Sequence, residues 1–205
     1  MSQSAPFSSG VAFAPEYLRS WLFLSLFASA VVASWSVGTS SDLSTWQLWT
    51  RYTARISFPI FLMAYAARPL HALLAQPWTA WLRKNRRNIG LSFALLHIIH
   101  LAALVGFFIT SGEPISLVTL IGGGLAYFLI VLMALTSTDA MIKKLGPVTW
   151  RRLHLVGMHY LAFIFFQSYL GAALQPGNLI FFVHVVAILA IVACRMALFF
   201  RMRRR

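Results

Sequence analysis

The sequence predicts an all-α integral membrane protein, built as a bundle of six transmembrane helices with both termini in the cytoplasm. Of its 205 residues, 60% are hydrophobic and only 10% are charged, a balance that water-soluble domains of this size do not have. The apolar residues form continuous runs rather than the alternating pattern of a transmembrane β-barrel. The basic residues gather beside alternate runs, and this asymmetry sets the expected orientation.

Six apolar runs reach the ~20 residues that a helix needs to cross ~30 Å of hydrocarbon. Turn-forming residues at 111–114 separate the third run from the fourth, and those at 175–178 separate the fifth from the sixth. We expect a cytoplasmic segment at 1–16, the membrane domain at 17–200 and a basic tail at 201–205. The expected spans are Tyr17–Val37, Ile56–Leu74, Ile89–Thr110, Ile115–Leu135, Trp150–Leu174 and Leu179–Phe200.

The orientation follows from the Lys and Arg residues, since all but two of the 17 lie on one side of these spans. The exceptions are Arg51 and Arg55, which precede the second span. The positive-inside rule therefore places both termini, and the loops after the second and fourth spans, in the cytoplasm. We expect the chain to lie among the lipids of a bacterial cytoplasmic (inner) membrane. Its net charge of +13 serves this topology and does not indicate nucleic acid as a partner.

All the histidines lie in or at the edge of these apolar runs. An ionisable side chain in hydrocarbon costs at least ~2–3 kcal/mol unless it is paired, coordinated or hydrated. Neutral imidazole is also a good ligand for metals, including haem iron. A single histidine more often bonds to a neighbouring helix, which suits His71 and His184. Two histidine-bearing spans of the same direction instead favour coordination; they carry His97, His100, His154 and His159.

The third and fifth spans both run outward, so one imidazole from each could hold a haem b between them. On a straight helix His97 lies ~15 Å beyond the last basic residue before its span. The same estimate places His154 ~3 Å and His159 ~10 Å beyond Arg152, the last basic residue before them. Depth therefore pairs His97 with His159 better than with His154, but a tilt of the long fifth span leaves both pairings open.

Two stretches resemble the ferric reductase-like transmembrane domain family. Arg-Arg-Asn-Ile-Gly-Leu at 86–91, followed by His97 and His100, resembles the family's third-helix signature. The segment at 135–154, which ends in Trp-Arg-Arg-Leu-His at 150–154, is similar to its fourth-to-fifth helix segment. The similarity covers about residues 56–200.

This family includes the haem b membrane subunit of bacterial methionine-sulfoxide reductase systems and the membrane cores of ferric reductases and NADPH oxidases. Its members hold b haems between the third and fifth helices and pass electrons across the membrane. The resemblance implies electron transfer between a cytoplasmic or quinol donor and a membrane or periplasmic acceptor. The chain would be the membrane component of an oxidoreductase without its own flavin or nicotinamide domain. A flavoprotein, a quinol or a periplasmic reductase would be its separate redox partner.

The sequence departs from the family at one expected ligand position. Gln167 stands where the methionine-sulfoxide reductase subunit has its second fifth-helix histidine, so we expect one haem rather than two. The expected iron ligands are His97 and His154, with His100 and His159 as alternates. Candidate partners for the haem propionates are Arg87, Arg151 and Arg152. Candidate aromatic lining residues are Phe93, Tyr160, Phe163 and Phe166.

Two other functions fit the same composition. A degenerate relative whose histidines only tie helices together would be a non-haem membrane scaffold or partner subunit, and Gln167 favours it. A small proton-coupled transporter would use histidine as a proton relay. It is disfavoured because every acidic residue lies in a loop or at a span end: Glu16, Asp42, Glu113 and Asp139.

Overall fold

The computed structural model describes residues 42–203, which form helices without any β-strand among them. These helices are α2 (Asp42–Leu74), α3 (Pro77–Ser111), α4 (Leu117–Leu135), α5 (Asp139–Leu145), α6 (Pro147–Ala173) and α7 (Phe181–Arg203). Five of them are long and apolar enough to cross a membrane, which confirms an all-helical membrane chain. They match the second to sixth predicted spans. The first span (17–37), the segment at 1–16 and the last two tail residues lie outside the described part.

Two helices extend well beyond their predicted apolar runs. α2 begins at Asp42 rather than Ile56, so Arg51 and Arg55 are helical. α3 begins at Pro77 rather than Ile89, so the basic stretch at 83–87 is helical and not a loop. Hydropathy detects only the part of a helix that lies in hydrocarbon, whereas Arg and Lys are good helix formers. Proline at the first helical position also suits the start of α3.

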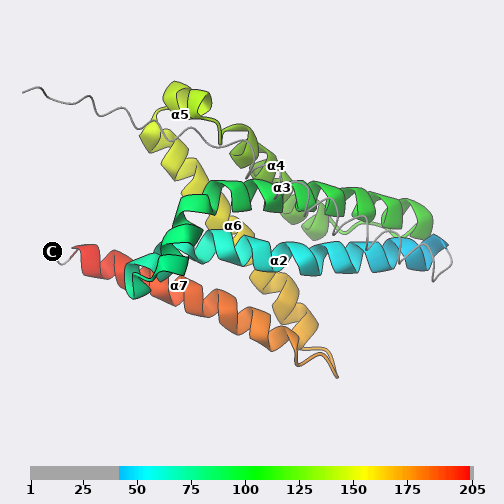
Figure 1. Ribbon diagram of the computed structural model, residues 1–205. Helices are drawn as coiled ribbons and strands as arrows, with labels where there is room; N and C mark the ends of the chain where they lie inside the picture. The colour runs from blue at the N-terminus through cyan, green and yellow to red at the C-terminus, as the bar shows by residue number, and fades with distance from the viewer. Residues whose placement is uncertain (1–41, 204–205) are drawn as a thin grey trace, which may run out of the picture.

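Figure 1 shows α2 and α3 side by side over most of their length, with α6 crossing this pair. α6 packs against α4 and α7, and α7 returns to contact α2. The α2–α3 connection, α5 and the C-terminal end of α7 lie toward the left of Figure 1, and we call this the basic end. The α3–α4 and α6–α7 connections lie toward the right. The basic stretch of α3 thus shares one end of the molecule with the C-terminal end of α7.

Aromatic rings from α2, α3 and α6 form the centre of the bundle. Phe61 of α2 lies 5.3 Å from Phe93 of α3 and 4.9 Å from Phe165 of α6, measured between ring centroids. Phe58 lies 4.6 Å from Tyr169 in an edge-on arrangement. Such pairs contribute ~0.5–1.5 kcal/mol each beyond the area that they bury. The core therefore fixes the relative positions of the helices that carry the predicted site.

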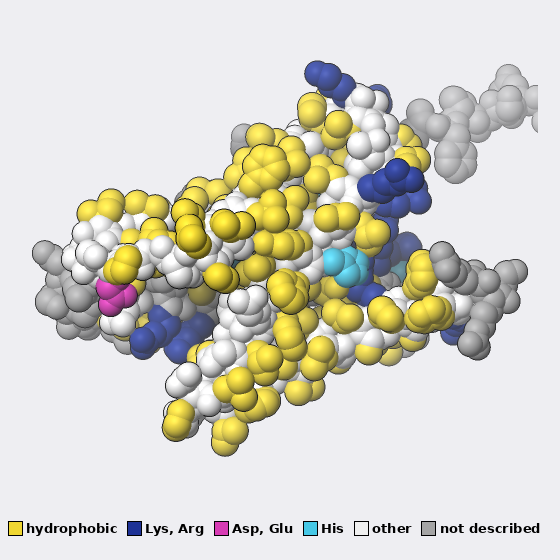
Figure 2. All heavy atoms as spheres, turned by 180° about the vertical axis from the view of Figure 1, so that it is seen from behind, with side chains coloured by type: hydrophobic (Ala, Val, Ile, Leu, Met, Phe, Trp, Pro, Cys, Tyr) yellow, Lys and Arg dark blue, Asp and Glu magenta, His cyan; other side chains and the backbone are white. Residues whose placement is uncertain are grey.

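The outer surface is apolar, as a lipid-facing surface must be. Figure 2 shows hydrophobic side chains over most of one face, with Lys and Arg gathered toward its ends. On α4, Leu117, Val118 and Ile121 are each about 70% exposed. Because exposed apolar patches of this extent are rare on water-soluble monomers, lipid is the expected surrounding of these helices.

Arg195 of α7 supplies a hydrogen bond that α2 cannot make within itself. Pro69 lies inside α2 and has no N–H, so the carbonyl of Tyr65 lacks its usual donor four residues on. The guanidinium of Arg195 donates to that carbonyl oxygen at 3.0 Å. Its central carbon also lies 4.6 Å from the centroid of the Tyr65 ring. This residue thereby links α7 to α2 inside the bundle.

Gly106 allows α3 to approach the N-terminal half of α2. A Cβ added there would overlap the indole of Trp46, whereas one added at Gly124 meets nothing within 4 Å. We expect Gly106→Ala to lower the stability of the purified protein by ~1–2 kcal/mol, since overpacking outweighs the gain in helix propensity. Thermal unfolding in detergent measures this, with Gly124→Ala as the matched control. Equal melting temperatures for both variants would contradict the close packing.

Candidate functional site

Two cavities contain three of the four predicted ligand histidines. The first, about 560 Å³ in volume, is lined by His97 and His100, and we call it the His97 cavity. The second, about 360 Å³, is lined by His154, and we call it the His154 cavity. Phe93 lines the His154 cavity, and its ring lies 4.7 Å from that of His97, one turn further along α3. The two cavities are therefore neighbours along the bundle.

The His97 cavity has largely apolar walls from several helices. Gly123 and Ala126 of α4 form one wall, and Leu161 and Phe165 of α6 form another. A Cβ added at Gly123 meets no atom within 4 Å, so this glycine leaves open space in the cavity. The next glycine toward the N-terminus, Gly122, instead packs against α6, because its carbonyl accepts a hydrogen bond from the Tyr160 hydroxyl.

A buried hydroxyl lies beside one ring nitrogen of His97. The Nδ1 atom of His97 lies 3.1 Å from the Oγ of Ser57, a fully buried residue of α2. The Ser57 hydroxyl donates to the carbonyl of Ala54 at 2.9 Å, and its oxygen can accept from His97 when Nδ1 carries the ring proton. In that tautomer Nε2 is unprotonated, the state in which imidazole binds a metal.

The same arrangement holds His100 one turn further along. Its Nδ1 atom lies 2.9 Å from the Oγ1 of Thr53, which is buried in α2. The Thr53 hydroxyl donates to the carbonyl of Trp49 at 2.7 Å, which leaves its oxygen able to accept from His100. Each cavity histidine thus has its Nδ1 within hydrogen-bond distance of a buried hydroxyl of α2. Hydrogen bonding of the other ring nitrogen is the usual support of a metal-ligating histidine.

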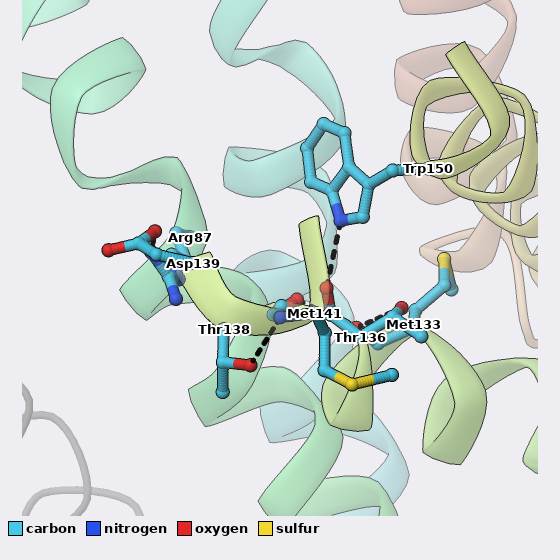
Figure 3. A network of polar contacts seen from close by, with 8 residues as sticks. Arg87, Met133, Thr136, Thr138, Asp139, Met141 and Trp150 are labelled. Atoms are coloured by element: carbon cyan, nitrogen blue, oxygen red, sulfur yellow. Dashed lines mark hydrogen bonds and ion pairs between the residues drawn. The ribbon is translucent and has the colours of Figure 1, made fainter. Parts of the chain in front are cut away.

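His154 lies in a different environment. Its Nε2 atom is 3.5 Å from the Oγ1 of Thr136, whose hydrogen goes to the carbonyl of Leu132. Its ring lies 4.3 Å from that of Trp150, and the Trp150 indole donates to the carbonyl of Thr136 at 3.0 Å. Figure 3 shows Trp150 and Thr136 meeting where α4 ends. In His154 it is therefore Nε2 that faces a hydrogen-bond partner, the reverse of His97.

The remaining histidines line neither cavity. His159 is exposed, and its Nδ1 donates to the carbonyl of Leu155 in its own helix at 2.7 Å. His71 is bonded to Thr79 across the α2–α3 connection, at 3.1 Å. The Nδ1 of His184 is buried without a partner among the described residues, and its ring stacks 4.5 Å from that of Tyr169.

The structure thus brings together His97 and His100, but it does not bring His97 and His154 to a common cavity. Two imidazoles three residues apart on one helix share a face, so they cannot lie on opposite sides of a porphyrin. His159, which the depth estimate paired with His97, is exposed and does not line the His97 cavity. Gln167 is also exposed and lines neither cavity. One axial imidazole, from α3, is what the His97 cavity can offer a haem iron.

The predicted propionate partners differ in their surroundings. Arg87 forms an ion pair with Asp139 at 2.7 Å, shown in Figure 3. Arg151 and Arg152 are exposed and line neither cavity. The arginines that do line the His97 cavity are Arg51 and Arg55 of α2, which the sequence assigned only a topological role. Of the predicted aromatic residues, Phe163 is 57% exposed, so it faces outward rather than into the bundle.

Sequence reasoning also missed Thr53 and Ser57, which orient the two cavity histidines. A usable signal was present, since these hydroxyl residues are four apart and therefore share one face of a helix. Within residues 42–203, no group of three or more His, Cys, Asp or Glu side chains lies close enough to hold a metal ion by itself.

Comparison with known proteins gives one distant similarity. Magnetosome protein MamZ of Magnetospirillum gryphiswaldense is 29% identical to this chain over 126 residues, which cover 54% of this chain and 19% of MamZ. No family model matches the chain. No solved structure matches it either. The ferric reductase-like resemblance accordingly stays a prediction.

Proposed function

We propose that this chain is a membrane electron-transfer protein that binds one haem b in the His97 cavity. One observation carries the proposal: two histidines, each with its Nδ1 beside a buried hydroxyl, line a largely apolar cavity. Neutral imidazole with its second nitrogen hydrogen-bonded is a suitable axial ligand for haem iron. His97 is the first candidate for that ligand and His100 the alternate.

The other cavity residues fit the shape and charge of haem. Gly123 and Ala126 leave room in the α4 wall beside Tyr127, and a flat macrocycle needs such room. Arg51 and Arg55 lie among the lining residues, and guanidinium groups pair strongly with carboxylates such as propionates. A bound haem would supply one-electron redox chemistry, and the surrounding side chains would exclude water and set its potential.

We further propose that the described helices, with a sixth span before them, place both termini in the cytoplasm of a bacterial inner membrane. The basic end shared by the α3 start and the C-terminal end of α7 supports this orientation under the positive-inside rule. Electrons would then pass between a cytoplasmic or quinol donor and a membrane or periplasmic acceptor. The partner would be a flavoprotein, a quinol or a periplasmic reductase on another chain.

The first test is a dithionite-reduced minus air-oxidised visible spectrum of the detergent-purified protein. We expect b-type Soret and α bands, together with a pyridine haemochrome value near one haem per chain. One haem is expected because, among the described residues, two predicted ligand histidines line the His97 cavity, whereas one lines the His154 cavity. A value of two would contradict the single-haem assignment, and no haem after expression with ample haem supply would contradict the proposal.

Filling the His97 cavity tests where the haem lies. We expect Gly123→Leu to reduce haem content severalfold, because Gly123 lines the cavity and a Cβ added there meets no atom within 4 Å. Gly124→Leu is the matched control, since Gly124 also has nothing within 4 Å but is exposed and lines neither cavity. Haem-to-protein absorbance ratios measure the difference. Equal ratios in the two variants would place the haem elsewhere.

A second candidate is a non-haem membrane scaffold of the same fold. The observation that favours it is that His71, His97 and His100 each bond to a hydroxyl of another helix or turn. In a scaffold these bonds would only tie helices together. A colourless protein whose thermal stability falls in His97→Ala would support the scaffold, whereas haem loss in that variant supports the electron-transfer proposal.

A further inference from the structure

The His154 cavity combines a strongly basic mouth with an apolar interior. Five cationic side chains line it: Arg68 of α2, and Arg83, Lys84, Arg86 and Arg87 of α3. Deeper in, Phe93, Ile130, Met133 and Met158 supply apolar walls from three helices. A cavity of this kind fits a ligand that is anionic at one end and apolar at the other.

The cations in this mouth are poorly neutralised by protein. Among the described residues, Arg87 alone has a carboxylate partner, Asp139. Arg86 is half-buried and lies near enough to Arg68 and Arg195 for their positive charges to repel. An anion between these groups would relieve that repulsion. The N–H groups of the planar arginine guanidinium also match the geometry of phosphate oxygens.

The protein groups of this cavity suit a lipid better than a second haem. His154 is the only histidine that lines it, and its Nε2 faces Thr136 rather than open space. Trp78 and Trp81, about half exposed, flank the basic stretch of α3, and exposed tryptophan is typical of the headgroup level of a bilayer. The mouth therefore lies where lipid phosphates lie.

We propose that the His154 cavity binds an anionic phospholipid, with its phosphate among the arginines and its acyl chain against the apolar walls. Basic pockets between transmembrane helices on the cytoplasmic side are known to take such headgroups. The proposal does not depend on haem in the neighbouring cavity. It assigns the basic stretch of α3 a binding role in addition to its role in topology.

The test is a native mass-spectrometry titration of the full chain, delipidated in detergent, with dioleoylphosphatidylglycerol. We expect a saturable adduct of one lipid per chain, and no comparable adduct with dioleoylphosphatidylcholine. The double variant Arg83→Gln/Arg86→Gln should weaken this binding about tenfold or more, because the protein loses two of the cations that would attract the lipid headgroup. The control Arg151→Gln/Arg152→Gln removes two exposed charges that lie outside the cavity, and it should leave binding unchanged.

Equal weakening in both double variants would overturn the proposal in favour of a diffuse surface attraction. Competition by millimolar sodium phosphate, equal to that by the lipid, would assign the site to a soluble anion instead. Gly90→Leu gives an independent variant, because it fills open cavity space and keeps every charge. It should abolish the lipid adduct and leave haem content unchanged; loss of haem in Gly90→Leu would mean that haem, not lipid, occupies this cavity.

Discussion

Replacing His97 with alanine is expected to reduce the haem content of the purified protein about tenfold or more, an effect at least as large as losing a residue that supports a metal ligand. The reason is local, since His97 lines the cavity and its Nδ1 lies within hydrogen-bond distance of the Ser57 hydroxyl. The measurement is the pyridine haemochrome value per chain. Because the His97 ring packs against Phe93 and Phe165 of the aromatic core, thermal unfolding of the variant is measured alongside, to separate loss of haem from loss of fold.

His184→Ala is the matched control for this experiment. His184 is also a histidine within a span, but it stacks against Tyr169 and lines neither cavity, so its haem content should equal that of the wild type. Full haem in His97→Ala with loss in His100→Ala would move the ligand by one turn of α3. Full haem in both variants would remove the His97 cavity from the proposal.

The hydroxyl that supports His97 gives a readout that separates ligand from structural roles. Ser57→Ala leaves the imidazole in place but removes the hydrogen-bond partner of its Nδ1. We expect weaker haem binding and a shifted midpoint potential in the fraction that remains loaded. Threonine at this position keeps the hydroxyl and should restore both values. An unchanged potential in Ser57→Ala would show that this hydroxyl does not tune the site.

The membrane-spanning character of the chain was predictable because hydrocarbon imposes a simple requirement on the sequence. About 20 apolar residues are needed for each span, and residues 42–203 meet it in every predicted run. Helix ends were less predictable, since Arg and Lys continue a helix beyond the bilayer. Arg51 and Arg55 illustrate this. The charge pattern places them before the second span, although both lie inside α2.

The histidines were predictable as a set but not as a pairing. Depth depends on position along a helix, which sequence gives directly at 1.5 Å per residue. Rotation about the helix axis depends on which neighbours pack against it. The sequence estimate gives His159 a depth close to that of His97, yet Leu161 and Phe165 of α6 line the cavity instead. Thr53 and Ser57 were overlooked because their role exists only once α2 and α3 are paired.

Arg195 offers the second large effect. We expect Arg195→Met to destabilise the protein by ~2 kcal/mol or more, because the buried carbonyl of Tyr65 is left without a donor and a cation–π contact is lost. Methionine preserves most of the apolar length of the side chain, so the loss of packing is small. Unfolding in detergent, followed by circular dichroism, measures the change.

Pro69→Ala tests whether the loss arises at that carbonyl. Alanine restores an N–H four residues after Tyr65, which lets α2 complete its own hydrogen bond. In the Pro69→Ala background, Arg195→Met should therefore cost less than half of what it costs in the wild type. This coupling is the signature of a shared acceptor, since independent sites give additive effects. If Arg195→Met costs the same in both backgrounds, Arg195 does not act by completing α2, and its contact with the Tyr65 ring is left as the link between α7 and α2.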